Sequence, residues 1–180
     1  MKQQIVKSMN SPLVLPTTEQ LEAAGLKGFD AFLKLYYDLY WERLGGELTL
    51  ETMPRLTGEQ HAVVSYMILR TEVLDGGFIQ LIQNGYGAYI FDNPFAKAMR
   101  MFGAKDLSKL VYKAKKLYDE NKQILEQDRS DEEFMALYEQ YEQFDDLDDE
   151  FIIMEQDASM TVASYIDDHL DLFYIEEIAK

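Results

Sequence analysis

The sequence predicts an all-α protein, folded as a single compact domain of about seven or eight helices. Apolar residues recur along the chain at intervals of three and four, the spacing of a buried helical face, and almost nowhere at intervals of two. The 180 residues suit one ordinary domain, and 47% hydrophobic residues can form its core. We expect one domain over 1–180, with 1–16 as an irregular N-terminal arm and 128–180 as a strongly acidic helical portion.

Start and stop signals place the first helices. Threonines at 17–18 precede the first helical segment, and an aromatic-faced helix is predicted over 26–44, ended by the glycine pair 45–46. Thr57 and Gln60 have the spacing of a capping box, in which each side chain bonds to the backbone N–H of the other residue. A helix should therefore begin there and continue to Leu74.

The middle helices are shorter. Asp75-Gly76-Gly77 interrupts the helical pattern, which resumes briefly over 78–83. Asn93-Pro94 favours a new helix start, since proline suits the first turn, and this helix should end at Gly103. The next helix is predicted over 107–125 from its apolar spacing.

The last third continues the helical pattern. Ser130 and Glu133 form another capping box, and an apolar stripe over 134–158 alternates between steps of three and four. This stripe predicts one helix or two collinear helices. A final helix is expected over 162–178.

The excess charge of the chain lies entirely in this last third. Residues 1–127 hold 15 acidic and 15 basic residues, whereas 128–180 hold 18 acids against Arg129 and Lys180, which gives the net charge of -16. An acidic field of this kind attracts basic surfaces and repels nucleic acids and anionic membranes. We therefore predict a basic protein partner, with no direct nucleic-acid or membrane binding.

Composition excludes several classes of site. The chain has no cysteine, so it has no disulfide framework, thiolate metal site or cysteine nucleophile. The segment 1–16 has no continuous apolar run before Pro12, so we do not expect a signal peptide. No stretch approaches the roughly 20 apolar residues of a membrane span. The expected location is cytoplasmic.

The middle of the chain carries a longer pattern, formed by Leu56-Thr57-Gly58-Glu59-Gln60, by Glu72-Val73-Leu74-Asp75-Gly76-Gly77-Phe78-Ile79-Gln80 and by Asn84. It resembles the signature of the bacterial DNA-mimic protein family, small acidic helical proteins whose named member acts as a dimer on a transcription factor. The likeness covers about residues 55–175. Asp75 departs from the family, which usually has Asn before the glycines. The resemblance implies a helical fold, a DNA-binding protein as partner and a homodimer.

The signature residues Glu72, Gly76, Gly77, Phe78, Gln80 and Asn84 are expected to be mainly structural. Two glycines between helical segments allow a positive φ or a close backbone approach. The alternative is a small ligand pocket lined by Glu72, Asp75, Gln80 and Asn84. A phosphate-binding loop is not expected, because no GxxxxGK[ST] pattern is present.

The densest acids are the candidate partner-binding residues, namely Asp145, Asp146, Asp148, Asp149 and Glu150, followed by Asp167, Asp168 and Asp171. As helix, the last 53 residues span roughly 80 Å, which as three adjacent rods places 18 carboxylates on about 27 Å. That is roughly one charge per 1.5 Å, comparable with about 1.7 Å for duplex DNA. The alternatives are a merely solvated face, or a helix N-terminus that the acids stabilise through its dipole.

The basic segment 97–122, with eight bases against three acids, is a second alternative to an open acidic surface. It could pair with the acidic portion inside the fold or in a second copy. Five net charges cannot neutralise 16, so most of the acidic surface should remain open.

No enzyme activity, cofactor or metal site is predicted. A short sequence pattern formed by Asp168, His169 and Asp171 is similar to metal-hydrolase motifs. However, His61 and His169 lie far apart in the sequence, and no HExxH motif exists. A metal-dependent hydrolase is therefore the weaker alternative. The other alternative to a regulator of a transcription factor is an immunity-type inhibitor of a basic nuclease toxin.

We predict that the isolated protein binds neither DNA nor RNA, because the acidic portion repels phosphate. The basic segment 97–122 is the part of the chain that could oppose this result. A mobility-shift assay at moderate salt should show no shift, and saturable binding would contradict the DNA-mimic hypothesis.

Overall fold

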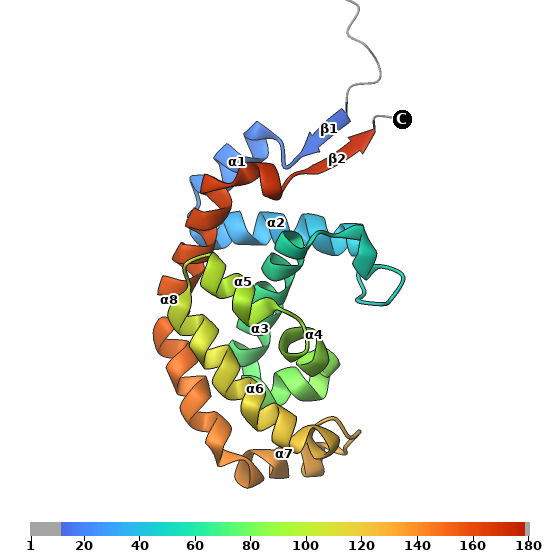
Figure 1. The fold of residues 1–180 in the computed structure, drawn as a ribbon, viewed down its shortest axis with the longest axis vertical. Helices are drawn as coiled ribbons and strands as arrows, with labels where there is room; N and C mark the ends of the chain where they lie inside the picture. The colour runs from blue at the N-terminus through green and yellow to red at the C-terminus, as the bar shows by residue number, and fades with distance from the viewer. Residues whose placement is uncertain (1–11, 179–180) are drawn as a thin grey trace, which may run out of the picture.

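The centre of the fold is helix α3, Gly58–Leu81, in a computed structural model that describes residues 12–178 (Figure 1). Every residue from Ala62 to Leu69 is buried, so α3 must be covered on all sides in this part. The covering comes from α2, Phe29–Leu44, from α5, Phe95–Met101, and from α8, Asp145–Asp168.

The other helices complete this shell. Helix α1, Thr18–Gly25, packs on α2, and α6, Lys105–Leu125, packs on both α5 and α8. Shorter elements connect them: the 3-10 turns Met53–Arg55, Glu142–Phe144 and Leu170–Leu172, the π-helical turn Ile82–Tyr86, and the helices α4, Gly87–Phe91, and α7, Asp131–Gln140. Helix α8 runs along one long edge of the molecule (Figure 1). Helices α1 to α8 within residues 12–178 confirm the predicted all-α class.

The capping signals read from the sequence are confirmed. The Gln60 backbone N–H donates to Thr57 Oγ1 at 3.3 Å, and the Thr57 N–H donates to Gln60 Oε1 at 3.1 Å. Ser130 and Glu133 form the same reciprocal pair at the start of α7. Gly45 ends α2 in the left-handed region, with φ 83°.

A two-stranded sheet was not predicted. Strand β1, Pro12–Leu15, pairs antiparallel with β2, Ile175–Ile178. The prediction of an irregular arm over 1–16 is therefore corrected for 12–15, while residues 1–11 lie outside the described residues. Each strand has only four residues, too few for a clear alternation. Their pairing joins distant parts of the chain, which no local pattern reveals.

The acidic portion also departs from expectation at its end. The stripe over 134–158 forms two helices, α7 and α8, separated by the turn Glu142–Phe144. Helix α8 then continues unbroken to Asp168, so the separate final helix predicted over 162–178 is wrong. The apolar spacing of that segment continues the stripe of α8 as far as Ile166, and β2 follows after a 3-10 turn.

The predicted interruption at 75–77 is confirmed as a kink inside α3. Gly76 has φ -157° and ψ 22°, and Gly77 has φ 76° and ψ -177°. The Gly77 conformation belongs to a region that glycine alone adopts readily. A Cβ atom on Gly77 would also lie 2.2 Å from Asp148 Oδ2, so a side chain there would displace the Asp148 carboxylate as well as strain the backbone.

Replacing Gly77 by alanine should lower the free energy of unfolding by about 1 to 3 kcal/mol, because alanine is strained at this φ and meets Asp148. Gly76→Ala is the matched control. Gly76 has a negative φ, so alanine is not strained there as it is at Gly77, and its added Cβ would displace only the partly exposed Gln80 side chain with its hydrogen bonds, so the loss should be smaller. Urea unfolding measures both, and equal losses would contradict this account of the kink.

Candidate functional site

The outward side of α8 carries six exposed carboxylates, which we call the acidic face: Asp145, Asp146, Asp149, Asp157, Asp167 and Asp168. At about 100° per helical residue, these positions fall within an arc of about 140°. The buried positions of α8, which include Leu147, Phe151 and Val162, lie on the opposite side. Five of the eight predicted partner-binding acids belong to this face. Asp171 is exposed just beyond its end, in the turn Leu170–Leu172.

The first acids of this face lie at a helix N-terminus. Helix α8 begins at Asp145, and Asp145, Asp146 and Asp148 occupy its first turn. The partial positive charge at the start of a helix stabilises acids in that turn, typically by 0.3 to 1 kcal/mol each. The dense run therefore also has a local structural reason, one of the alternatives drawn from the sequence.

Asp148 does not point outward with its neighbours. Its Oδ1 accepts a hydrogen bond of 2.8 Å from the backbone N–H of Phe78, where α3 resumes after the kink. On the other side of the kink, Tyr138 of α7 donates to the Gly76 carbonyl oxygen at 2.7 Å. The acidic portion thus supplies both hydrogen-bond partners of the kink, and Asp148 acts as a cap for the second half of α3.

Burial, together with the nearby charges of Asp145 and Asp149, raises the pKa of Asp148 from 3.8 to about 6, although the Phe78 N–H acts in the opposite direction. Ionised Asp148 is therefore a cost to the folded state that its hydrogen bond offsets in part. The sequence does not reveal the burial or the hydrogen bond of Asp148, because Asp148 and Asp149 are adjacent residues of the same type.

A second acid of α8 lies inside the protein. Glu155 is 8% exposed and forms an ion pair with Arg70 of α3, which also contacts Asp30 at 3.0 Å. Ser159 donates to Glu155 Oε1 at 2.9 Å, and the Ser159 hydroxyl lies 2.6 Å from the Tyr66 hydroxyl. This network connects α8 to α3. This network was not predicted from the sequence, although the position of Glu155 within the apolar stripe was a signal.

Most acids of segment 128–180 have no basic neighbour. Among residues 12–178, only three of these 18 acids lie within 4.0 Å of a basic group, in the pairs Glu150 with Lys113, Glu155 with Arg70 and Glu177 with Arg43. The acidic face itself has no ion pair in this part of the chain.

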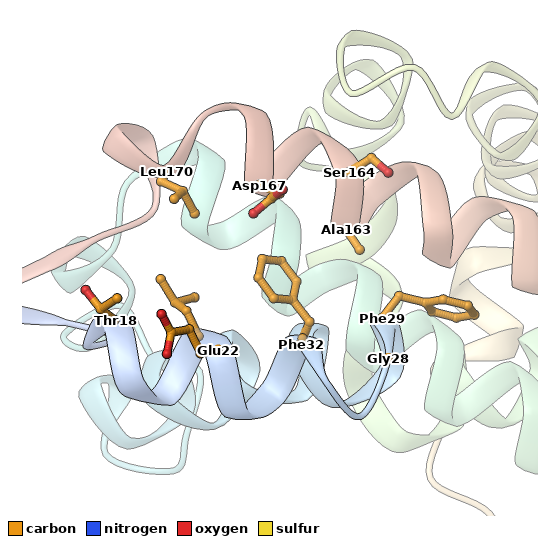
Figure 2. A pocket seen from close by; sticks show the side chains of 11 residues that line it. Thr18, Glu22, Gly28, Phe29, Phe32, Ala163, Ser164, Asp167 and Leu170 are labelled. Atoms are coloured by element: carbon orange, nitrogen blue, oxygen red, sulfur yellow. The ribbon is translucent and has the colours of Figure 1, made fainter.

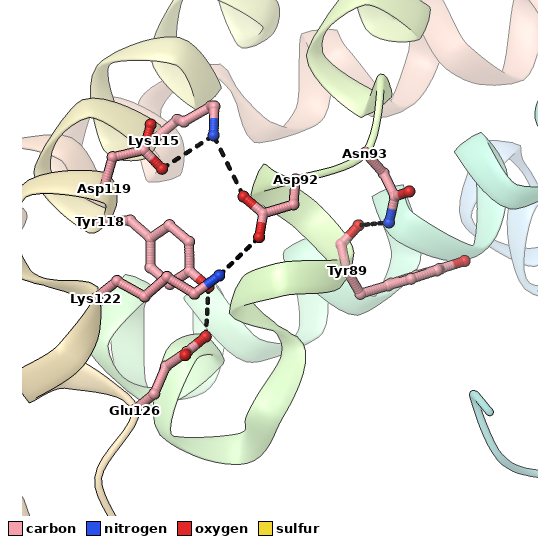
Figure 3. A network of polar contacts seen from close by, with 8 residues as sticks. All are labelled: Tyr89, Asp92, Asn93, Lys115, Tyr118, Asp119, Lys122 and Glu126. Atoms are coloured by element: carbon pink, nitrogen blue, oxygen red, sulfur yellow. Dashed lines mark hydrogen bonds and ion pairs between the residues drawn. The ribbon is translucent and has the colours of Figure 1, made fainter. Parts of the chain in front are cut away.

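Four of the eight bases in the basic segment 97–122 pair with nearby acids outside the acidic portion, and Figure 3 shows two of them. Lys115 contacts Asp92 and Asp119, and Lys122 contacts Asp92 at 2.7 Å. Tyr118, which lies beneath the Lys122 ammonium, donates to Glu126. Within the described residues, Lys113 with Glu150 is the one ion pair between this segment and the acidic portion. Internal pairing therefore leaves the acidic face open.

The charge spacing differs from the estimate based on three adjacent rods. Helix α8 has 24 residues and spans about 36 Å, along which the acidic face has about one charge per 6 Å. One strand of B-DNA carries a charge every 3.4 Å. A match to DNA therefore requires the exposed acids of α7 and the following turn, which adjoin the start of α8: Asp131, Glu132, Glu133, Glu139 and Glu142.

Exposed apolar side chains interrupt the acidic face. Ile153 is 84% exposed, and Ile152 and Met160 are also exposed on α8. All three lie off the apolar stripe that packs inside. A patch of apolar residues rimmed by charge is typical of a protein interface. These residues were not among the predicted partner-binding residues, although their position off the stripe was a signal.

The possible metal-binding residues at the end of α8 do not converge. Asp168 and Asp171 are exposed, whereas the His169 ring stacks on Tyr165 and its Nδ1 lies 2.8 Å from the Tyr165 carbonyl oxygen. Residues 12–178 contain no group of three or more His, Asp or Glu placed to hold a metal ion. The geometry gives the hydrolase alternative no support.

The polar signature residues bind one another. Gln80 Nε2 donates to Asp75 at 2.8 Å and to Glu72 at 3.2 Å, and Asn84 Nδ2 donates to Glu72 at 2.7 Å. Phe78 is buried beside Phe144 and Phe91. These contacts support the structural interpretation of the signature over a ligand pocket.

These features define a small acidic α-helical protein whose signature stabilises a helix kink against its acidic portion. Its sequence matches the family described as DMP19-like protein over residues 54–169, more than half of the chain, and the chain belongs to this family. This result confirms the resemblance to DNA-mimic proteins. Among the helices of residues 12–178, none has the length and apolar character that a membrane crossing requires.

A named relative is the DNA mimic protein DMP19 of Neisseria meningitidis serogroup B (strain ATCC BAA-335 / MC58). The two are 40% identical over 76 residues, which is 42% of this chain and 46% of the relative. The match thus spans about half the length of that protein.

Asp148→Asn keeps a carbonyl oxygen for the Phe78 N–H and removes the charge. Because folding raises the pKa of Asp148 from 3.8 to about 6, its ionisation lowers the free energy of unfolding as pH rises through this window. We expect Asp148→Asn to gain stability over the wild type between about pH 4 and pH 6.5, with a constant difference above. Urea unfolding at several pH values measures this.

Two further variants control this experiment. Asp157→Asn removes an exposed charge elsewhere on α8 and should not show this pH-dependent gain. Asp148→Ala leaves the Phe78 N–H without its acceptor and should be about 1 to 2 kcal/mol less stable than Asp148→Asn, as for a lost helix cap. A pH-independent gain in Asp148→Asn would contradict the proposed burial cost.

Proposed function

We propose that this protein binds a basic DNA-binding protein through the acidic face and so occupies the surface that would otherwise hold DNA. The observation that carries the proposal is the outward side of α8, with six exposed carboxylates that have no basic partner within residues 12–178. Membership of the DMP19-like family and the name of the DNA mimic relative support it.

Carboxylates fixed along a rigid helix can replace phosphates because a basic groove binds either kind of anion. Asp145, Asp146 and Asp149 form the denser end of the face, next to the acids of α7. Asp167, Asp168 and Asp171 extend it at the other end. Asp148 contributes indirectly, since it holds the start of α8 against the kink. Glu150 is half-buried and forms an ion pair with Lys113, so it contributes less to partner binding.

The exposed apolar residues give the partner a second kind of contact. Ile153 and Met160 are seven residues apart, two helical turns, and therefore lie on the same side of α8 between the two acidic ends. Burial of such side chains supplies affinity that does not depend on salt. We propose that they form the apolar centre of the interface and that the acids form its charged rim.

The preferred partner is a bacterial transcription factor. The proposed role is therefore regulatory and not enzymatic, and its proposed location is the cytoplasm. A basic nuclease toxin, inhibited by an immunity-type mechanism, is the alternative, and genes that neighbour this one distinguish the two. A homodimer would place two acidic faces in one particle. Sedimentation equilibrium measures this state.

The test begins with recovery of the partner by pull-down at low and high salt, followed by titration. Asp145→Asn, Asp146→Asn and Asp149→Asn combined should weaken binding at least tenfold and flatten its dependence on salt, because fewer counterions are released. Stability should change by less than about 1 kcal/mol, because the side chains are exposed and the lost interaction with the helix dipole is offset by weaker repulsion among neighbouring acids. The matched control, Glu42→Gln with Glu47→Gln and Glu51→Gln, removes three exposed charges far from α8 in the sequence and should bind as the wild type does.

Equal affinity and equal salt slope for both triple variants would show that the acidic face is only solvated. Ile153→Ser with Met160→Ser tests the apolar centre in the same titration. We expect weaker binding with an unchanged salt slope, since these residues carry no charge. Wild-type affinity in this variant would limit the interface to the acids.

A further inference from the structure

A cavity of about 440 Å³ lies between α1, the start of α2 and the end of α8 (Figure 2). This volume is in the range of about 300 to 1,000 Å³ that is usual for small-molecule sites. The cavity is separate from the signature residues and from the apolar centre of the acidic face. The inference drawn from it does not rest on the proposed protein partner.

Apolar side chains from three helices and the turn after α8 form much of the wall: Leu21, Phe29, Phe32, Ala163 and Leu170. Phe32 projects from α2 toward Ala163 of α8 and Leu170 of the following turn, which lie on the other side (Figure 2). Gly25, the last residue of α1, and Gly28, just before α2, also line the cavity. A Cβ atom added at Gly25 would meet no atom within 4 Å, so the absence of a side chain leaves room there.

The charged groups of the wall are two carboxylates on opposite sides. Asp167 projects from α8 into the gap, and Glu22 belongs to α1 (Figure 2). Both are exposed, and no basic residue lines the cavity. Within residues 12–178, neither carboxylate lies within 4.0 Å of a basic group. The hydroxyls of Thr18 and Ser164 add two hydrogen-bonding groups.

This combination selects the chemical class of the ligand. Two carboxylates without a base repel anions and attract cations. A hard metal ion such as Ca²⁺ takes six to eight oxygen ligands, which does not fit so apolar a wall. An organic cation uses both parts, because its charge pairs with the acids while its hydrocarbon is removed from water. An aromatic ring such as Phe32 also attracts a cation over its face.

We propose that this cavity binds a small organic cation with an apolar body, of the alkylammonium class. The ammonium lies between Asp167 and Glu22. The hydrocarbon part packs on Phe32 and Leu170. Asp167 thus gains a role separate from the rest of the acidic face.

Three probes of equal chain length test the class of ligand: hexylammonium, hexanol and hexanoate. Each is titrated into the isotope-labelled protein and followed by backbone amide shifts in two-dimensional NMR. Hexylammonium should saturate, shift the amides of Gly25, Gly28 and Ala163, and bind at least tenfold more tightly than hexanol. Hexanoate should not bind. Equal affinity for hexanol would overturn the proposal, since the acids would then play no part.

Two pairs of neutralised acids separate this site from general attraction to a charged protein. Asp167→Asn with Glu22→Gln should weaken hexylammonium binding at least tenfold. Asp146→Asn with Asp149→Asn removes the same number of exposed charges from the other end of α8 and should leave binding unchanged. Equal loss in both pairs would overturn the proposal in favour of unspecific electrostatic attraction.

Filling the cavity tests its location. Gly25→Leu places a side chain at the lining position that has room, and its φ is ordinary for any residue. The variant should stay folded and lose saturable binding. Ala163→Leu, which fills the cavity from α8, is the second variant in case the first alters the turn. Unchanged hexylammonium binding in a folded form of either variant would overturn the proposal.

Discussion

The hydrogen bond from the Phe78 amide to the Asp148 carboxylate is the contact on which the arrangement of this protein depends. At Gly77 the central helix α3 is broken, and its resumed half begins with N–H groups that need acceptors inside the protein. The acceptor comes from α8, 70 residues later in the sequence. Tyr138 satisfies the carbonyl oxygen on the other side of the break. The acidic portion is therefore part of the folded core, not an appended charged tail.

This integration divides the acids of α8 by function although they share one helix. Glu155 compensates Arg70 in the interior, and Asp148 caps the kink at the cost of a buried charge. Of the remaining carboxylates, Glu150 pairs with Lys113, and the six of the acidic face lie outward. Because most bases of α6 are paired with acids nearby, as Lys122 is with Asp92, they do not neutralise that surface. One helix thus carries both exposed, unpaired carboxylates and buried or partly buried acids that are hydrogen-bonded or ion-paired within residues 12–178.

The helices, their caps and the break at 75–77 were predictable because each depends on residues within about one helical turn. The pairing of β1 with β2 was not, since its two partners are separated by almost the whole chain. The inward direction of Asp148 and the outward direction of Asp149 could not be predicted without knowing where α8 begins, because successive side chains of a helix differ in direction by about 100°. The cavity between α1, α2 and α8 could not be predicted from the sequence either, because its walls come from both ends of the described chain.

The unbroken length of α8 has a mechanical consequence. Asp149 and Asp167 are 18 residues apart on one unbroken helix, so the length of helix between the two acidic ends is about 27 Å. Duplex DNA bends to meet a protein, and the energy of bending is part of what the protein senses. A helix packed along its length against α3 and α6 has no comparable freedom. Under the proposed function, α8 would present its two acidic ends at a nearly constant separation, and a basic groove that binds only strongly bent DNA would not fit it.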